Sequence, residues 1–428
     1  MPLDYPVHER TLPNGLRVVV SPDPSVPNVT VNIWVGVGSR HEAPGRTGFA
    51  HLFEHLMFQG SRNVRSGEHF EALMAEGGRL NATTWFDRTN YFETVPRGAL
   101  ELALWLEADR HGHLLDAVNQ ANLDNQRDVV KEEKRQRYDN QPYGNALLDV
   151  YAAVFPEGHP YHHATIGSME DLDAASVDDV HRFFRAHYAP DNTLLTLCGD
   201  VTPEDGFALA ERYLGAIEEN AQERRPPVDP LGPLPAPVRV ERWEDVPNDR
   251  LHVAFRLPVD ETEEFTAAGL ALDALGGLTS SRLVRRMVRR EQTALGVHAT
   301  SWGFVDGVSL GFLVIDVAAE SDTDAVEATL LEELERFAVE GPTEAEMDAA
   351  MAQAERGWLH MLASQEERAD ALSHYALLHG DPRLVNTHLD RLRAVTPEQV
   401  RAAAARWLRP ESRAVVAYRT DVSTEEVA

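Results

Sequence analysis

The sequence contains a single cysteine, Cys198, among 428 residues. One thiol excludes an intramolecular disulfide, and its place in an apolar run that begins at Thr193 favours a buried strand residue over a nucleophile. Apolar runs of about 18 residues, the length that spans a bilayer, are also lacking. The first residues, Met1 to Tyr5, do not show the basic region and apolar stretch of a secretory signal. We therefore expect a chain that does not enter a membrane and that lies in the cytoplasm.

Basic residues are scarce as well. The 40 Lys and Arg stand against 69 Asp and Glu, which gives a formal net charge of −29. Such a surplus of negative charge repels nucleic-acid phosphates, so we expect no nucleic-acid partner. Apolar residues make up 43% of the chain and charged residues 25%, as is usual for globular proteins, and the length allows two or more domains.

The stretch from Gly48 to Phe58 carries an unusual set of titratable residues. His51, Glu54 and His55 stand at positions i, i+3 and i+4, which fall on one face of a helix. Two imidazoles so placed can share one Zn²⁺, and the glutamate beside them can take the proton of a bound water. This order, H-x-x-E-H, is the inverzincin signature. The same stretch also has the apolar face of an ordinary core helix, so the motif alone leaves both interpretations open.

An internal repeat favours the metal interpretation. The second half of the chain matches the first at an offset of about 220 residues, and two similar helix starts, Ser176–Val180 and Thr396–Val400, correspond at this offset. At the same offset the three titratable residues of the motif correspond to Ala271, Ala274 and Leu275. The second copy keeps the apolar positions without any titratable group, so the fold itself does not require the two histidines and the glutamate.

The repeat also predicts the domain organisation. A charged and proline-rich stretch separates the two copies and is typical of a linker. We expect an N-terminal zinc-binding domain over residues 1–218, a linker over 219–238, and a homologous C-terminal domain without a metal site over 239–428.

A catalytic zinc site usually takes a third protein ligand. Glu132 and Glu133 lie in a charged segment that we predict to be helical from about Leu123 to Arg137. Adjacent helical side chains point about 100° apart, so only one of the two glutamates can face the metal, and the residues themselves leave the choice open. The histidine-rich loop Gly158–His163 is not expected to supply a ligand, because a proline and adjacent imidazoles suit helical ligation poorly.

The sequence closely resembles the M16 metallopeptidase family, in particular its two-domain M16B type. Pitrilysin, insulin-degrading enzyme and the mitochondrial processing peptidase are members of this family. The resemblance rests on the tandem repeat and on five stretches: His51–His55, Asn81–Thr84, Arg127–Glu133, His159–Tyr161 and Tyr188–Asn192. It implies an α+β fold with two tandem homologous α/β domains, each a mostly antiparallel sheet covered by helices, known as the LuxS/MPP-like metallohydrolase fold.

The resemblance further implies a zinc metalloendopeptidase with one Zn²⁺ per chain. Carried over residue by residue, the ligands are His51, His55 and Glu133, with Glu132 as the second choice, and Glu54 is the catalytic base. Family members often carry another glutamate one heptad before the ligand, where this chain has the neutral Gln126.

The family binds its peptide substrate as an extra strand along a sheet edge. The stretch that matches this edge, and that we expect to bind substrate, is Asn81, Ala82, Thr83 and Thr84. Binding of this kind uses backbone hydrogen bonds and gives weak sequence specificity.

Family peptidases also use an arginine and a tyrosine from the second half of a clamshell. The tyrosine is absent here, since the residues seven positions after Arg289 and Arg290 are Gly296 and Val297. The resemblance therefore implies a homologous partner subunit that lacks the zinc motif and supplies the Arg/Tyr pair in a heterodimer, with a homodimer as the alternative.

Two other functions fit the same sequence. The family includes non-catalytic structural core subunits of respiratory complexes, and the intact motif speaks against that role. A zinc hydrolase acting on a small molecule is the second alternative, and the edge strand favours peptides over such a substrate.

Overall fold

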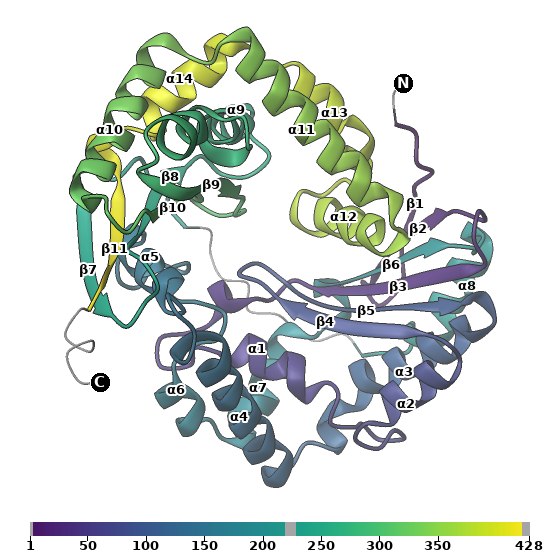
Figure 1. The fold of residues 1–428 in the computed structure, drawn as a ribbon. Coiled ribbons are helices and arrows are strands. Elements are labelled where there is room, and N and C mark those ends of the chain that lie inside the picture. The colour runs from purple at the N-terminus through teal and green to yellow at the C-terminus, as the bar shows by residue number, and fades with distance from the viewer. Residues whose placement is uncertain (1–2, 219–227, 422–428) are drawn as a thin grey trace. The chain divides into compact units, whose positions relative to one another are not determined.

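The computed structural model describes residues 3–218 and 228–421 (Figure 1). They form two compact units, each assembled from separate stretches of the chain. Unit 1 comprises Met1–Lys134, His163–Arg225 and Trp358–His388, and unit 2 comprises Arg135–His162, Pro226–Gly357 and Leu389–Ala428. The division into domains over 1–218 and 239–428 follows the sequence repeat and stays a prediction. Of the expected linker, residues 219–227 lie outside the described residues.

Unit 1 contains a six-stranded sheet with the order β1-β2-β6-β3-β5-β4 (Figure 1). All neighbours are antiparallel except β2 and β6. The strands are β1 (His8–Thr11), β2 (Arg17–Pro22), β3 (Asn28–Val35), β4 (Arg79–Thr84), β5 (Thr89–Pro96) and β6 (Thr193–Gly199). The two β-rich runs around residues 85–88 form the hairpin β4–β5. Strand β4 closes one edge of the sheet.

Helices cover both faces of this sheet. Successive residues of a strand point to opposite faces, so neighbouring residues of one strand pack on different helices. Val18 and Val20 pack with α3 (Leu100–His113) and α8 (Pro203–Leu214), whereas Val19 between them packs with α12 (Gln365–Leu378). The other helices lying wholly in unit 1 are α1 (Phe49–Leu56), α2 (Glu68–Ala75), α4 (Gln120–Lys134), α6 (Met169–Ala174) and α7 (Val177–His187).

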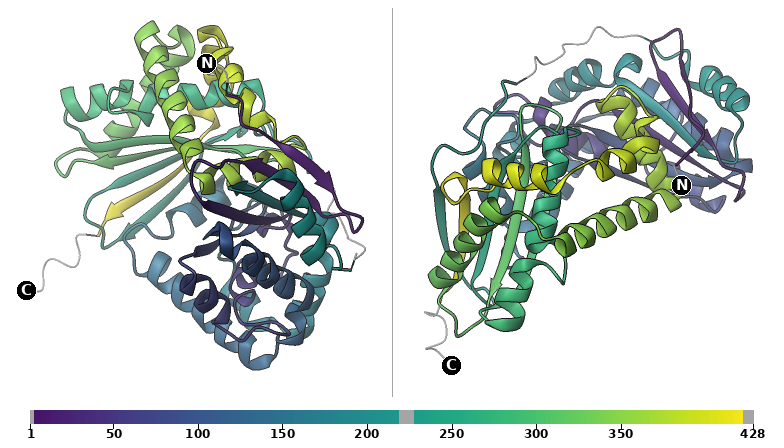
Figure 2. Two further views of the ribbon diagram at one scale, coloured as in Figure 1. Left: turned by 90° about the vertical axis from the view of Figure 1, so that its right-hand side faces the viewer. Right: turned by 90° about the horizontal axis from the view of Figure 1, so that it is seen from above.

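Unit 2 has the same topology, with the strand order β7-β11-β8-β10-β9 and one parallel pair, β7 with β11. This order matches β2-β6-β3-β5-β4 in unit 1. The strands are β7 (Val238–Glu244), β8 (Arg250–Leu257), β9 (Ala294–Trp302), β10 (Ser309–Val317) and β11 (Ala414–Thr420). Figure 2 shows the yellow strand β11 beside the teal and green strands of this sheet. The predicted α+β fold with two homologous, mostly antiparallel sheets is confirmed.

The remaining helices complete unit 2 or are shared. Those in unit 2 are α5 (Ala146–Val154), α9 (Glu263–Leu272), α10 (Thr323–Glu340) and α14 (Pro397–Trp407), and residues of α11 (Glu344–Ala363) and α13 (Leu384–Arg393) belong to both units. Single 3₁₀ turns occur at Ser39–His41, Arg97–Ala99, Leu114–Asp116, Pro190–Asn192 and Pro410–Ser412. Wider π-helical segments span Arg135–Asp139, Asp273–Gly277 and Val284–Arg290.

Two helices are exchanged between the halves of the sequence. Helix α5 comes from the first half and packs on β7, β8 and β11 of unit 2, whereas α12 comes from the second half and packs on β2, β3, β5 and β6 of unit 1. The two helices correspond in the repeat at an offset of about 220 residues. Each sheet is therefore covered in part by a helix that the other half of the chain supplies.

The one thiol of the chain is buried in the sheet of unit 1. Cys198 lies on β6 and is fully buried, as expected, with the guanidinium Nε of Arg368 3.3 Å from its sulfur.

Among the residues that the structure describes, no helix combines the length and the apolar character that crossing a bilayer requires. The cytoplasmic location stays a prediction.

A buried carboxylate in unit 2 makes stability dependent on pH. Glu346 of α11 is 4% exposed and accepts hydrogen bonds from Arg282 at 2.7 and 3.1 Å and from Arg285 at 2.6 Å. Burial opposes ionisation, but the hydrogen bonds from Arg282 and the Thr343 backbone, together with the charge of Arg282, lower the pKa of Glu346 to about 2. Because this folded-state pKa lies below the ordinary value, the ionised carboxylate stabilises the fold at neutral pH, and its contribution is lost as the pH falls from about 4.5 towards 2.

Glu346→Gln should therefore lower the free energy of unfolding at pH 7 by on the order of 3 kcal/mol. The difference from the unchanged protein should narrow as the pH falls below about 4.5. Thermal unfolding followed by circular dichroism over this pH range measures both effects. Glu344→Gln changes an exposed carboxylate of the same helix and is the control. A stability difference that does not vary with pH would contradict the role of the ionised side chain.

Candidate metal centre

Helix α1 presents His51 and His55 from consecutive turns. The N-cap of the helix is Gly48, whose φ of 89° is rarely adopted by residues with a side chain. Its apolar side is buried, and the ring of Phe53 stacks on Phe183 of α7 with centroids 4.8 Å apart. This packing fixes the helix, and the Nε2 atoms of the two histidines lie 3.3 Å apart.

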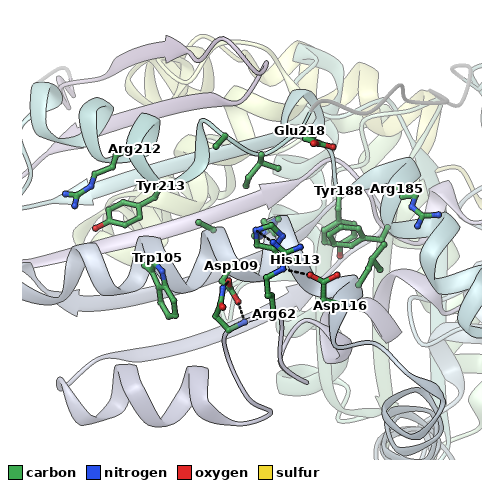
Figure 3. Close-up of a pocket in the computed structure, with 18 residues that line it drawn as sticks. Arg62, Trp105, Asp109, His113, Asp116, Arg185, Tyr188, Arg212, Tyr213 and Glu218 are labelled. Atoms are coloured by element: carbon green, nitrogen blue, oxygen red, sulfur yellow. Dashed lines mark hydrogen bonds and ion pairs between the residues drawn. The ribbon is translucent and has the colours of Figure 1, made fainter.

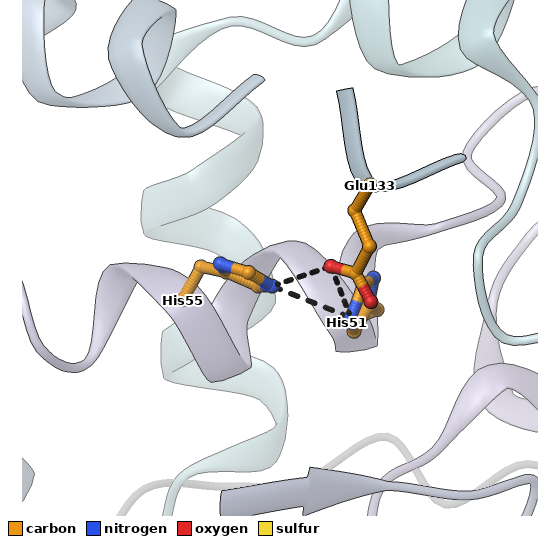
Figure 4. A group of neighbouring side chains, drawn as sticks. All are labelled: His51, His55 and Glu133. Atoms are coloured by element: carbon orange, nitrogen blue, oxygen red, sulfur yellow. Dashed lines mark hydrogen bonds and ion pairs between the residues drawn. The ribbon is translucent and has the colours of Figure 1, made fainter. Parts of the chain in front are cut away.

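Glu133 of α4 points at the two imidazoles and completes a triangle of donor atoms (Figure 4). Its Oε2 lies 3.6 Å from His51 Nε2 and 3.3 Å from His55 Nε2. Ligand atoms at 2.0–2.1 Å from a tetrahedral zinc would be about 3.3–3.4 Å apart, so the triangle has the size of one face of such a tetrahedron. Two imidazole nitrogens and one carboxylate oxygen form a donor set that suits catalytic zinc and leaves a fourth position for water. The residues present therefore fit the metal that the sequence predicts.

The structure separates the two adjacent glutamates. The carboxylate of Glu133 reaches the histidines, whereas Glu132 is exposed on α4. Helix α4 runs to Lys134, and a π-helical segment follows it to Asp139. These bounds agree closely with the helix predicted from Leu123 to Arg137. Gln126, two turns before Glu133, is 5% exposed and donates its amide Nε2 to Asn125 Oδ1 at 3.0 Å.

Glu54 lies on α1, between the two histidines in sequence. Its Oε2 accepts a hydrogen bond from Thr84 Oγ1 at 2.6 Å. Burial raises the pKa of Glu54, the negative charge of Glu133 adds to the rise, and the Thr84 hydrogen bond and the charges of His55 and Arg88 oppose it. A carboxylate with a raised pKa is a better proton acceptor at neutral pH than an ordinary one, which suits acid–base catalysis.

The predicted substrate strand is the edge strand β4. The backbone N–H of Trp85 donates to the carbonyl of Arg88 at 2.9 Å and closes the hairpin. Backbone groups of an antiparallel strand alternate between its two sides, so the N–H and C=O of Ala82 and Thr84 face the open edge of the sheet. The two threonine side chains of this stretch form hydrogen bonds within unit 1. Thr84 contacts Glu54, and Thr83 Oγ1 donates to Asn90 Oδ1 at 2.5 Å. The side chain of Asn81 is exposed.

Arg88, in the turn of this hairpin, was not singled out from the sequence. Its Nη1 donates to the carbonyl and the hydroxyl of Thr83 at 2.9 and 2.5 Å, and its guanidinium lies 5.0 Å from the centre of the Trp34 ring. The indole Nε1 of Trp34 donates to Asp370 of α12 at 2.9 Å. Arg88 thus holds the edge strand and also carries the positive charge that opposes the pKa rise of Glu54. No local pattern marks Arg88, because the Trp34 ring that it contacts is remote in the sequence.

A separate hollow of about 660 Å³ lies in unit 1 (Figure 3). Its walls come from α3, α7, α8 and adjoining loops and include Trp105, Tyr188 and Tyr213. None of the predicted site residues lines it, and two of its charged residues, Arg62 and Asp116, pair with each other at 2.6 Å. The hollow is therefore distinct from the metal centre.

Comparison with known proteins identifies the family. The family described as "Insulinase (Peptidase family M16)" matches residues 17–166, and the one described as "Peptidase M16 inactive domain" matches residues 174–354. The chain belongs to peptidase family M16. An uncharacterized zinc protease of Mycobacterium leprae is 31% identical to this M16 chain over 93% of its residues and 88% of the relative's own length.

Other M16 relatives extend the comparison. The crystal structure of a protease from Helicobacter pylori superimposes with a TM-score of 0.90 at 23% identity, covering 97% of this chain and all of the other, so the two share a fold. A probable mitochondrial-processing peptidase subunit beta of Schizosaccharomyces pombe is 28% identical over 50% of this chain and 46% of its own length. Relatives of this M16 chain are thus named as zinc proteases, and one is named as a subunit.

Proposed function

We propose that this M16 chain is a zinc-dependent endopeptidase subunit that hydrolyses peptides or unfolded polypeptides. The proposal rests on the triangle of His51, His55 and Glu133, whose donor atoms are spaced as a tetrahedral zinc requires. These residues would hold one Zn²⁺ per chain. The relatives named as zinc proteases support the same metal.

Zinc in this position would supply a Lewis acid for the scissile carbonyl and a bound water of lowered pKa. Glu54 accepts the proton of the attacking water and later transfers it to the leaving amine. The hydrogen bond from Thr84 orients the Glu54 carboxylate, and its burial keeps the pKa above the ordinary value, so that the side chain is a stronger base.

We propose that the substrate adds to β4 as a further strand. The outward backbone groups of Ala82 and Thr84 would pair with an extended peptide, and Asn81 to Thr84 form the substrate-binding stretch. A small molecule has no need of an open strand edge, so this feature favours a peptide substrate. Pairing through the backbone predicts weak preference for particular side chains.

A non-catalytic role is less well supported. The description "inactive domain" applies to residues 174–354, in which Ala271, Ala274 and Leu275 stand at the positions of the motif and are buried. The set of His51, Glu54, His55 and Glu133 lies outside that match and is intact.

We further propose a homologous partner subunit that supplies the missing Arg/Tyr pair. Gly296 and Val297 occupy β9 where the tyrosine would be expected, and neither can donate a phenol hydrogen bond. The relative named as a processing-peptidase subunit supports assembly in a heterodimer, and a homodimer is the alternative.

Metal content and peptide digestion test these proposals together. The purified chain should bind about one zinc per chain, and any cleavage of an unstructured peptide library should stop with 1,10-phenanthroline and return with added zinc. The chain alone should cleave more slowly than the complex isolated from its native source. A purified chain that is supplied with zinc and retains none would reject the metal centre. Full activity of the chain alone would reject the partner and leave the peptidase assignment standing.

A further inference from the structure

The beginning of α1 is held by a buried carboxylate. Its N-cap, Gly48, has no side chain to satisfy the first backbone N–H groups. Glu42 takes this role: Oε2 accepts from Gly48 N at 2.9 Å and Oε1 accepts from Ala50 N at 2.8 Å. The Glu42 side chain is fully buried, and a negative charge at this end of a helix is favoured by the helix dipole. His51 follows directly, so the position of the Glu42 carboxylate determines where the first predicted ligand stands.

Residues 163–171 form hydrogen bonds with the residues at this helix start. His163 Nε2 donates to Glu42 Oε2 at 2.9 Å. Thr47, the residue before the N-cap, donates to Asp171 Oδ2 from its backbone N–H at 2.9 Å and from its hydroxyl at 2.7 Å. The same hydroxyl accepts from the backbone N–H of Ser168 at 2.9 Å.

The contact between the two stretches is close as well as polar. A Cβ atom on Gly167 would lie 2.2 Å from the backbone nitrogen of Gly48, so only glycine fits there. Gly167 has a φ of 68° and is suited to this position for the same reason. The start of α1 therefore has little room to slide along the 163–171 stretch.

The same segment continues into α6 and holds α4, which carries Glu133. Arg127 of α4 donates from Nε to the carbonyl of Leu172 at 2.7 Å and from Nη2 to the carbonyl of Ala175 at 2.8 Å. The Leu172 carbonyl lies in the last turn of α6 and also accepts from the backbone N–H of Ala175, the C-cap of this helix. Lys131, one turn further along α4, forms an ion pair with Asp173.

We propose that residues 163–175, the positioning bracket, set the separation of α1 and α4 and thereby the affinity of the centre for zinc. The inference rests on the proposed zinc site and adds residues that position the ligands without binding the metal. Zinc ligands have to lie within about 0.2 Å of their ideal distances, and the ligands here come from helices that are remote in the sequence. The two helices also pack on each other, and the bracket is the one segment of those just described that is bonded to both.

Two substitutions remove contacts of the bracket, one to the start of α1 and one to α4. Thr47→Val keeps the shape of the side chain and removes the hydroxyl between Asp171 and Ser168. Arg127→Gln removes the hydrogen bonds to the end of α6. Matched controls elsewhere in unit 1 are Thr202→Val, which removes the hydroxyl that caps α8, and Arg97→Gln, which breaks the exposed pair with Asp200.

Zinc affinity is measured by competition with a chromophoric chelator, and the melting temperature is recorded with and without zinc. Each bracket variant should weaken zinc binding by about tenfold to a hundredfold, as outer residues of zinc sites do. The metal-free melting temperature should change no more than in the controls. The double variant should bind zinc almost as well as the weaker single variant, because both substitutions weaken the same connection between α1 and α4.

Three outcomes would overturn the inference. The bracket variants could bind zinc as tightly as the unchanged protein. The control variants could weaken zinc binding by as much as the bracket variants. In the double variant, the two fold-losses of zinc affinity could multiply, as they do for independent sites. If the unchanged protein itself bound no zinc, the proposed metal centre would fail, and this result is distinguishable from a failure of the bracket alone.

Discussion

Glu54→Gln should slow peptide cleavage severely and leave zinc bound. The amide cannot accept the proton of the attacking water, yet its oxygen can still accept the hydrogen bond from Thr84 that holds the side chain in place. Loss of a general base should lower kcat by about 10²–10⁴-fold. The turnover of a quenched fluorescent peptide at saturating concentration measures this loss, and metal analysis of the same sample shows whether the zinc content is unchanged.

Glu71→Gln is the matched control for this substitution. Glu71 is an exposed glutamate on the neighbouring helix α2, and its replacement should leave turnover unchanged. A Glu54→Gln protein that binds zinc and cleaves at the normal rate would show that another group accepts the proton.

Glu133→Gln should remove the zinc together with the activity. Two imidazoles and a neutral amide oxygen form a much weaker site than a set with a carboxylate, since the negative charge of the third ligand is lost. We expect zinc affinity to fall by more than about a hundredfold, beyond what outer residues of zinc sites contribute. Chelator competition measures the affinity, and peptide turnover in zinc-free buffer should fall in parallel.

The adjacent glutamate supplies a control of the same chemistry. Glu132 is exposed on α4, so Glu132→Gln should keep the zinc affinity of the unchanged protein. If Glu132→Gln lost zinc and Glu133→Gln kept it, the choice of the third ligand would be reversed.

The site residues that could be predicted from the sequence are those that lie close together along the chain. His51, Glu54 and His55 lie on one short helix, so their helical periodicity is enough to place them together. Glu133 is different, because periodicity excludes neither glutamate of the pair. The packing of α4 against α1 brings one of them to the histidines, and in the sequence the resemblance alone selected it.

The groups that surround these residues could not be predicted for a related reason. Thr84 was expected to contact substrate through its strand, and the structure shows its hydroxyl on Glu54. The charge of Asp370, which comes from a helix in the other half of the sequence, favours the charged form of Arg88. His163 belongs to the histidine-rich loop Gly158–His163, and its imidazole forms a hydrogen bond with the carboxylate of Glu42. Each of these contacts arises from tertiary packing, on which a local pattern carries no information.

The repeat could be recognised from corresponding turns and strands, and the shared strand order of the two sheets agrees with it. The exchange of α5 and α12 could not. An apolar helix face shows that something must cover it, and it does not say which sheet will do so.

That exchange has a consequence for the polypeptide as a whole. A fragment that stops at the connecting peptide would leave the side of the six-stranded sheet around Trp34 and Leu194 bare, and it would carry a helix with no sheet to cover. Neither half is therefore a self-sufficient folding module, and a nicked chain would behave as two pieces that complete one another.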